Sequence, residues 1–339
     1  MTRSIASNSS TCRALSKVLG RGVFFAAALF AAVSPASGQT FPNKPVRIIV
    51  PYGVGGVVDF VPRVLAERMS AELGQPVVVE NKSGGLGIPA MNEVLNSPPD
   101  GHVMIEVDAA HWAINPALTQ VNYNFTRDFA PVTLVFTNGL VFFTSTTSGI
   151  NSFEGLVALA KAKPGQLNYG SSGIGSTHHL AIESLKASLG LDIKHVPYRG
   201  GAEMAESVMR GDTHFSVVSM GTIMPLVKAG KLKMLAVSIP TRLKQIPDVP
   251  TVAEVTGLKD YSFPGQAGFV VKAGTPKAII DKLAAAFTKA AQQPDLAAKV
   301  LDTTASELTP STPEQLTELI RRDIVKFANA VKASGAKLE

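Results

Sequence analysis

Short β-branched runs alternate with segments of helical periodicity along most of this chain. The β-branched runs predict strands at 46–52, 76–80, 102–107, 131–136, 140–144, 167–172, 193–198, 214–219, 233–238 and 267–271. Between them, apolar residues recur at the three- and four-residue spacing of amphipathic helices in 60–73, 86–96, 152–161, 177–189, 202–210, 222–229, 277–291 and 313–334. Strands that alternate with helices favour parallel sheets with covering helices.

Two extended segments have the composition of crossings between domains. Residues 137–147, TNGLVFFTSTT, carry no charge, and residues 261–268, YSFPGQAG, are rich in Gly and Pro and lead into a strand. We therefore expect one lobe from residues 42–143 plus 264–339 and a second, inserted lobe from 144–263. The predicted fold class is α/β, a two-lobed clamshell in which each lobe is a mostly parallel sheet flanked by helices.

The first residues differ in composition from the rest. Basic residues precede the apolar run at 22–33, GVFFAAALFAAV, and the small residues SPASG follow it. This order predicts a secretory signal peptide over residues 1–38, cleaved near Gly38 or Gln39. The run is shorter than the roughly 20 apolar residues that span a bilayer. We expect a soluble protein exported to the periplasm.

Charge and cysteine content are interpreted after that cleavage. The whole chain has 32 Lys and Arg against 26 Asp and Glu; four of the basic residues lie in 1–38, which leaves 28 against 26. A net charge of only +2 gives no reason to expect a nucleic-acid partner. The one cysteine, Cys12, precedes the apolar run, so the mature chain is expected to have neither disulfides nor thiol chemistry.

The stretch PYGVGGVVD, residues 51–59, is a glycine-rich turn between a predicted strand and a predicted helix. Backbone N–H groups at a helix start attract anions, so phosphate, nucleotide and carboxylate all fit this turn. The stretch nearly matches a dinucleotide fingerprint, but Val58 stands where the third glycine belongs, and Glu80 is the one candidate for the acidic ribose ligand. An NAD(P)-dependent two-domain oxidoreductase is therefore the alternative interpretation. Asp59 is expected to cap the helix, and a ligand's amine or hydroxyl is its second possible partner.

A second glycine turn, YGSSGIGST at 169–177, again lies between a strand and a helix. Ser176 is a good N-cap and Gly190 a good terminator for that helix. The serines are spaced wrongly for a hydrolase elbow, which requires G-x-S-x-G, so they are interpreted as hydrogen-bond donors. Either turn alone fits a simple strand-to-helix connection equally well. Two such turns, one in each lobe, favour a shared anionic ligand.

The histidines form no metal-binding motif. His178 and His179 are adjacent and would point to different faces of a helix. Those at or near strands are expected to have structural hydrogen-bonding roles: His102, His195 and His214. Tyr52 and Trp112 are candidates for stacking on a ligand, with a place in the core as the alternative.

Taken in order, many stretches resemble the extracytoplasmic receptors of tripartite tricarboxylate transporters, the Bug or TctC family. They include FPNKPVRIIVPYGVGGVVD, VENKSGG, SPPDGHVMI, RDFAPVTLV, LNYGSSGIGSTHHLA, HVPYRGGAE, VKAGKLKMLAVS and IPDVPTVAEVTG, and together they span nearly the whole mature chain. The resemblance implies a periplasmic binding protein clamshell that closes over a small carboxylate and delivers it to a membrane permease. It implies no catalysis, cofactor or metal, and we expect a monomer.

By the same resemblance, both glycine turns hold the carboxylate. The matching residues are Tyr52, Gly53, Gly55, Gly56, Asp59, Ser171, Ser172, Gly175, Ser176 and Thr177. The chain departs from the family pattern at Val58, Pro62 and Gln266, where Thr or Ser, Ala and Trp are frequent. The ligand is therefore left open among di- and tricarboxylates, aromatic carboxylates and amino acids, and a sensory role shares the same fold.

Overall fold

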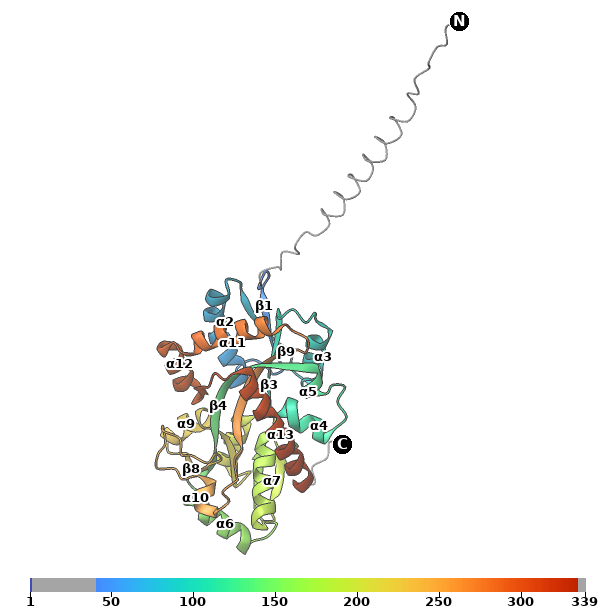
Figure 1. Cartoon of the computed structure of the whole chain (residues 1–339). Helices are drawn as coiled ribbons and strands as arrows, with labels where there is room; N and C mark the ends of the chain where they lie inside the picture. The colour runs from blue at the N-terminus through green and yellow to red at the C-terminus, as the bar shows by residue number, and fades with distance from the viewer. Residues whose placement is uncertain (2–40, 335–339) are drawn as a thin grey trace. The chain divides into compact units, whose positions relative to one another are not determined.

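A computed structural model describes residues 41–334, together with Met1. The predicted signal peptide, residues 1–38, lies outside the described residues except for Met1. In the described part, the strands form one mixed sheet in the order β2-β1-β3-β9-β4-β7-β5-β6, and β8 and β10 also pair with β4. The long strand β4 (Phe129–Ser145) belongs to both halves of this sheet (Figure 1).

The first half of the sheet has a parallel group in the order β2-β1-β3. β9 pairs antiparallel with β3, the beginning of β4 pairs antiparallel with β9, and β10 pairs antiparallel with β4. In β1, the adjacent residues Ile48, Ile49 and Val50 are all buried, which requires cover on both faces of the sheet. The strands are β1 (Val46–Val50), β2 (Val77–Asn81), β3 (Val103–Asp108), β9 (Pro264–Lys272) and β10 (Glu307–Leu308).

The second half repeats this arrangement. Its parallel group has the order β6-β5-β7, and the end of β4 and then β8 are antiparallel to it or to one another. The first strand of each half, β1 or β5, is therefore the middle strand of its parallel group. The strands are β5 (Asn168–Ser171), β6 (Lys194–Pro197), β7 (Phe215–Ser219) and β8 (Leu232–Val237).

The chain has the predicted α/β fold with two lobes, and β4 runs from one lobe into the other. The sequence predicts separate strands at 131–136 and 140–144, but they are one strand, because residues 137–139 stay paired with the start of β9. The parallel groups are as predicted, whereas β4 and β9 run antiparallel to their neighbours.

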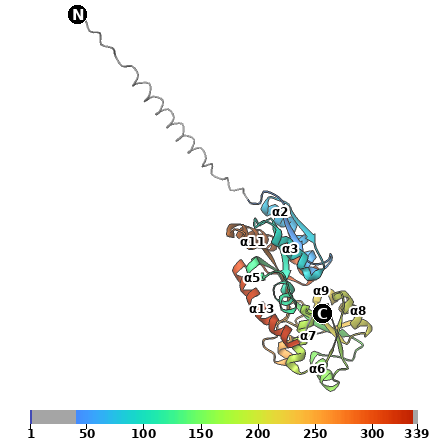
Figure 2. The ribbon, with the colours of Figure 1, turned by 90° about the vertical axis from the view of Figure 1, so that its right-hand side faces the viewer.

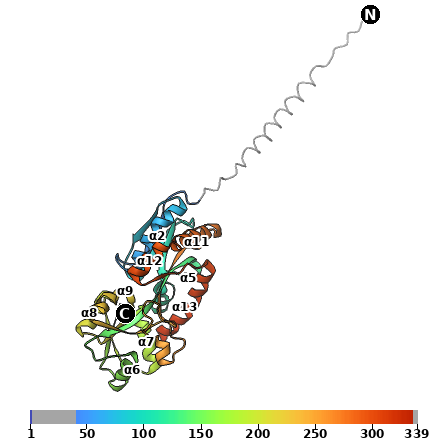
Figure 3. The same ribbon diagram turned by 90° about the vertical axis from the view of Figure 1, so that its left-hand side faces the viewer.

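The helices gather around the two halves of the sheet, with α2, α3 and α11 at one and α6, α8 and α9 at the other (Figures 2 and 3). All eight predicted helices are present: α2 (Val57–Leu73), α3 (Ile88–Asn96), α6 (Phe153–Ala162), α7 (Thr177–Leu189), α8 (Gly201–Arg210), α9 (Met220–Lys228), α11 (Lys277–Ala291) and α13 (Pro313–Ser334). The predicted helix at 86–96 is divided into the short η1 (Gly85–Gly87) and α3. The sequence patterns missed α4 (Asn115–Leu118), α5 (Phe125–Asp128), α10 (Val252–Thr256), α12 (Pro294–Thr304) and the π-helical turn η2 (Ala110–Ile114). None of the helices within residues 41–334 has the length and apolarity needed to cross a membrane.

Local sequence explains where α2 and α7 end. Ser176 caps α7 by accepting a hydrogen bond from the His179 N–H at 3.1 Å, as predicted. Gly190 then ends α7 in the left-handed region, with φ of 65°, and Gly74 ends α2 in the same way. Local sequence therefore fixes the start of α7 and the ends of both helices.

Candidate ligand-binding site

The two glycine turns occupy equivalent places in the two lobes. One follows β1 and the other follows β5, each at the carboxyl end of the middle strand of a parallel group. Ligands of open α/β sheets bind at this edge, where helices start and their N–H groups point outward. A cavity of about 430 Å³ lies here and is lined by residues of both lobes. This volume suits a small molecule.

Six of the ten residues that the sequence singles out line this cavity. The first lobe contributes Tyr52 and Gly53. The second contributes the others: Ser172, Gly175, Ser176 and Thr177. Tertiary structure thus brings together two turns that are more than a hundred residues apart in the sequence.

The remaining four residues lie outside the cavity lining: Gly55, Gly56, Asp59 and Ser171. Gly56 is the N-cap residue of α2, and a Cβ added there would meet only Val58 Cγ2, at 3.9 Å. Ser171 is fully buried, and its Oγ lies 2.6 Å from His195 Nε2 and accepts from the Gly173 N–H at 3.1 Å. Ser171 therefore stabilises the conformation of the second turn from outside the cavity.

Asp59 anchors the first turn. Its carboxylate accepts hydrogen bonds from the Gly55 N–H at 3.0 Å, from Arg63 Nε at 2.9 Å and from Asn81 Nδ2 at 2.8 Å. The expectation that it caps α2 is wrong in detail, because α2 has no side-chain cap and Asp59 binds an N–H that precedes the helix. Burial alone would raise the pKa of Asp59, but these donors lower it below its usual value.

The second turn approaches the first lobe closely at Gly175. This residue has φ of 77°, and a Cβ added to it would lie 1.9 Å from Leu118 Cδ1 and 3.6 Å from Ile114 Cγ2. Only glycine fits both the backbone angle and this contact without adjustment. Beside it, Ser172 Oγ lies 2.8 Å from His178 Nδ1, and both residues line the cavity.

A cluster of three side chains in the first lobe also lines the cavity, and sequence reasoning missed most of it. Tyr52 donates its hydroxyl to Asp108 Oδ2 at 2.6 Å, and His111 Nδ1 lies 2.8 Å from Asp108 Oδ1. Burial and the neighbouring Asp108 raise the pKa of Tyr52 well above its usual value, so the phenol stays protonated. Asp108 directly follows a predicted strand, and that position was the available signal.

The cavity holds no Lys or Arg among the described residues that line it. Its donors are hydroxyls and the N–H groups at the starts of α2 and α7, where a helix leaves such groups unpaired. Burial lowers the pKa of His178 to about 4, so this imidazole is uncharged at neutral pH. The site suits one carboxylate without a cationic side chain.

Of the other residues noted from the sequence, Val58 and His178 line the cavity, whereas Trp112, Gln266 and Pro62 do not. Trp112 is buried and donates its indole N–H to Asp323 Oδ2 at 3.1 Å, so it belongs to the core. Gln266 Nε2 donates to the same oxygen at 2.7 Å. Pro62 is buried within α2. Of the three departures from the family pattern, only Val58 touches the cavity.

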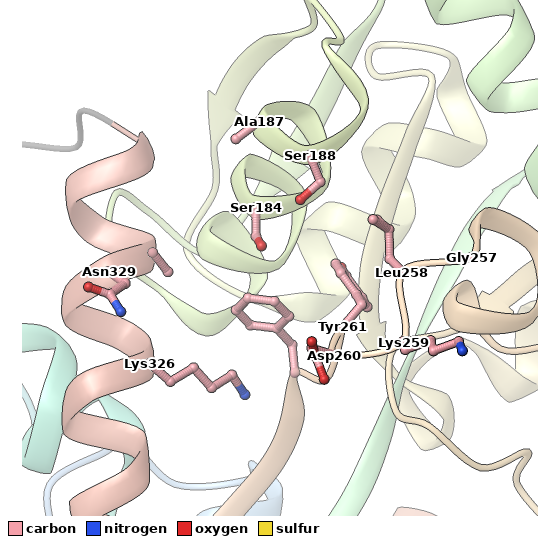
Figure 4. Close-up of a pocket in the computed structure, with 12 residues that line it drawn as sticks. Ser184, Ala187, Ser188, Gly257, Leu258, Lys259, Asp260, Tyr261, Lys326 and Asn329 are labelled. Atoms are coloured by element: carbon pink, nitrogen blue, oxygen red, sulfur yellow. The ribbon is translucent and has the colours of Figure 1, made fainter.

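A larger cavity, of about 640 Å³, lies elsewhere, between α7, α13 and the segment 257–263 (Figure 4). Lys326 points from α13 toward the segment that carries Asp260 and Tyr261. Its Nζ donates to the Ser262 carbonyl and lies 4.8 Å from the ring centre of Phe263. Neither glycine turn reaches this cavity, and Lys326, one of the two lysines in its lining, is already engaged by the chain itself.

Comparison with known proteins supplies the family. The profile of the tripartite tricarboxylate transporter family receptor, TctC, matches residues 61–336. The chain belongs to this family. A UPF0065 protein of Bordetella pertussis is 35% identical over 268 residues, 79% of this chain and 82% of the relative. The protein BugT of the same organism is 30% identical over 320 residues, 94% of this chain and 97% of the relative.

Solved structures of similar fold include several receptors of this type. A periplasmic transporter superposes with a TM-score of 0.77 at 34% identity, over 88% of this chain and all of that one. An R. palustris protein with adipate gives 0.78 at 27% identity, over 88% and 99% of the two chains. MatC from Rhodopseudomonas palustris, with bound malate, gives 0.74 at 26% identity, over 86% and 100%. The family is one of transport receptors, which places this TctC protein among solute-binding proteins.

Proposed function

We propose that this TctC protein captures a small carboxylate between its lobes and delivers it to the permease of a tripartite tricarboxylate transporter. Residues 1–38 would direct export to the periplasm, where the mature protein acts as a monomer. The lobes would comprise residues 42–143 plus 264–339 and residues 144–263, with β4 and β9 as the crossings.

The observation that carries this proposal is the convergence of two helix starts on one cavity. The α2 turn brings Tyr52 and Gly53, and the α7 turn brings Ser172, Ser176 and Thr177. Partial positive charge at both helix starts stabilises an anion, and hydroxyls add directed donors. Burying a carboxylate without such partners costs several kcal/mol, so the ligand would need both turns. Closure of the lobes would then bury it.

The alternative, an NAD(P)-dependent oxidoreductase, loses support at Glu80. This residue would have to bind a ribose, but its carboxylate accepts two hydrogen bonds from Arg47, from Nε and from Nη2, both at 2.6 Å. Val58 also fills the place of the third glycine. A carboxylate receptor needs neither feature.

A thermal-shift screen of the mature protein tests the proposal. Dicarboxylates, tricarboxylates, aromatic carboxylates, amino acids and NAD(H) would be compared, since a ligand at 100 times its Kd adds about 2.7 kcal/mol of stability. Calorimetry would then compare wild type with the Ser172→Ala, Thr177→Ala double variant, which should bind at least tenfold more weakly. Ser184→Ala is the matched control, because Ser184 lies on α7 but lines the other cavity. Stabilisation by NAD(H) and by no carboxylate would refute the receptor.

Transport itself needs a second assay. Uptake of the radiolabelled ligand into cells that carry the permease should require this protein, and cells without the permease should take up none through it. Uptake that is independent of the permease would favour the sensory role.

A further inference from the structure

The side-chain carboxylate of Asp108 lies in the wall of the cavity that we propose binds the carboxylate of a ligand. It is the last residue of β3, and its side chain is 24% exposed. It lines the cavity on the side of the first lobe. A negative side chain here would lower the affinity of the cavity for a ligand with several negative charges.

Asp108 is held as a charged group. Its Oδ1 accepts from the Ala110 N–H at 3.0 Å and lies 2.8 Å from His111 Nδ1, and its Oδ2 accepts from the Tyr52 hydroxyl at 2.6 Å. Burial alone would raise the pKa of Asp108, but His111, Tyr52 and the Ala110 N–H together lower it below its usual value. An ionised carboxylate offers about four acceptor positions. The Tyr52 hydroxyl and the Ala110 N–H occupy two of them and His111 Nδ1 lies against a third, which leaves one for a ligand.

The charge of Asp108 meets no cationic side chain across the cavity. Among the described residues that line the cavity there is no Lys or Arg. His178, on the facing wall, interacts electrostatically with Asp108 but is uncharged at neutral pH because burial lowers its pKa to about 4. The cavity therefore has two poles: donor groups at the start of α7 and a negative charge at Asp108.

We propose that Asp108 selects carboxylates whose other end carries a protonated amine. The ligand carboxylate would lie at the α7 turn, and its ammonium would donate to Asp108, as three rotatable N–H donors allow. Dicarboxylates and tricarboxylates of the same length are rejected, because a second carboxylate would face Asp108 without a counter-charge. This inference rests on the proposed carboxylate site and names the class of ligand that the site takes.

Two pairs of probes of matched length test the selection. Calorimetry on the mature protein would compare 4-aminobutyrate with glutarate and 5-aminovalerate with adipate; in each pair an ammonium replaces the second carboxylate. Wild type should bind the amino compound of at least one pair tenfold or more tightly than its diacid. Asp108→Asn should lose that preference, while Asp260→Asn, which removes an exposed charge beside the other cavity, should keep it.

The possible results distinguish a failure of the role of Asp108 from a failure of the proposed carboxylate receptor. Wild type that binds glutarate or adipate more tightly than the amino compounds overturns the role of Asp108 and leaves the carboxylate receptor standing. If the protein binds none of these probes and no carboxylate in the thermal-shift screen, the proposed function fails as well. The wild-type comparison holds even if Asp108→Asn does not fold. An Asp108→Asn protein that folds and keeps the amino preference also refutes the selection.

Discussion

Replacing Gly221 by Ala should weaken ligand binding without weakening the fold. Gly221 lies in the first turn of α9, in the second lobe, and a Cβ added to it would lie 2.8 Å from the carbonyl oxygen of Thr304, at the end of α12. The carbonyl carbon of Thr304 would be only 2.9 Å away. Ordinary contact begins at 3.4 Å. Because the obstacle is backbone, a side-chain rotation cannot relieve it, and α9 and α12 must move apart.

Two opposing effects set the magnitude. In an unobstructed helix, Ala is more stable than Gly by about 0.5 to 1 kcal/mol, and this gain is present in every arrangement of the lobes. Overpacking costs about 1 to 3 kcal/mol. This cost falls only on the closed arrangement of the lobes, in which α9 lies against α12. The two turns line one cavity in that arrangement. The Kd for the ligand should therefore rise roughly 5- to 150-fold, whereas the melting temperature of the free protein should stay unchanged or rise.

Calorimetry and thermal unfolding measure these two quantities on one preparation. Gly155→Ala is the matched control, because Gly155 also lies in the first turn of a helix, α6, and a Cβ there would meet only Ser152 Oγ, at 3.5 Å. Its affinity should equal that of wild type. Small-angle scattering should show a larger radius of gyration for Gly221→Ala in the presence of ligand. A Gly221→Ala protein with unchanged affinity would refute the reasoning, as would an equal loss in the control.

Three further changes test other parts of the structure. Gly175→Ala should lower stability by about 1 to 2 kcal/mol because of its positive φ, and it should also lower ligand affinity because its Cβ would clash with Leu118. Gly190 has a positive φ but no close neighbour, so Gly190→Ala should lower only the stability measured by urea unfolding. Asp59→Asn should cost about 1 to 3 kcal/mol at pH 7. Since the folded pKa of Asp59 is lowered, its contribution is present above its usual pKa of 3.8 and lost as the pH falls through the folded value, so unfolding at pH 3 should show a smaller difference from wild type. Trp112→Ala should destabilise by about 3 to 5 kcal/mol; a loss of affinity without a loss of stability would contradict its place in the core.

The sequence by itself determined the local elements and the turns that join them. The eight strongly periodic helices, the Ser176 cap and the Gly190 terminator follow from contacts within a few residues, so a pattern of letters is sufficient to predict them. The missed α12 had its own signals, because Pro294 stands at the first helical position and Leu296 and Val300 are buried one turn apart. The α/β class could be predicted because strands and helices alternate regularly along the chain.

Only the tertiary structure decided which side chains meet at the cavity. Whether Gly53 faces the cavity and Gly56 does not depends on how α2 leaves its strand, and whether Asp108 joins Tyr52 depends on β3 lying beside β1. The pairing of Trp112 and Gln266 on Asp323 likewise joins three distant segments. Strand order and register are set by packing of the whole sheet, and a one-residue shift turns every side chain of a strand to the other face. Residues that are neighbours in the sequence do not specify strand order or register. The position of Asp108 after a predicted strand could mark the residue, but its contacts with Tyr52 and His111 appear only in the folded chain.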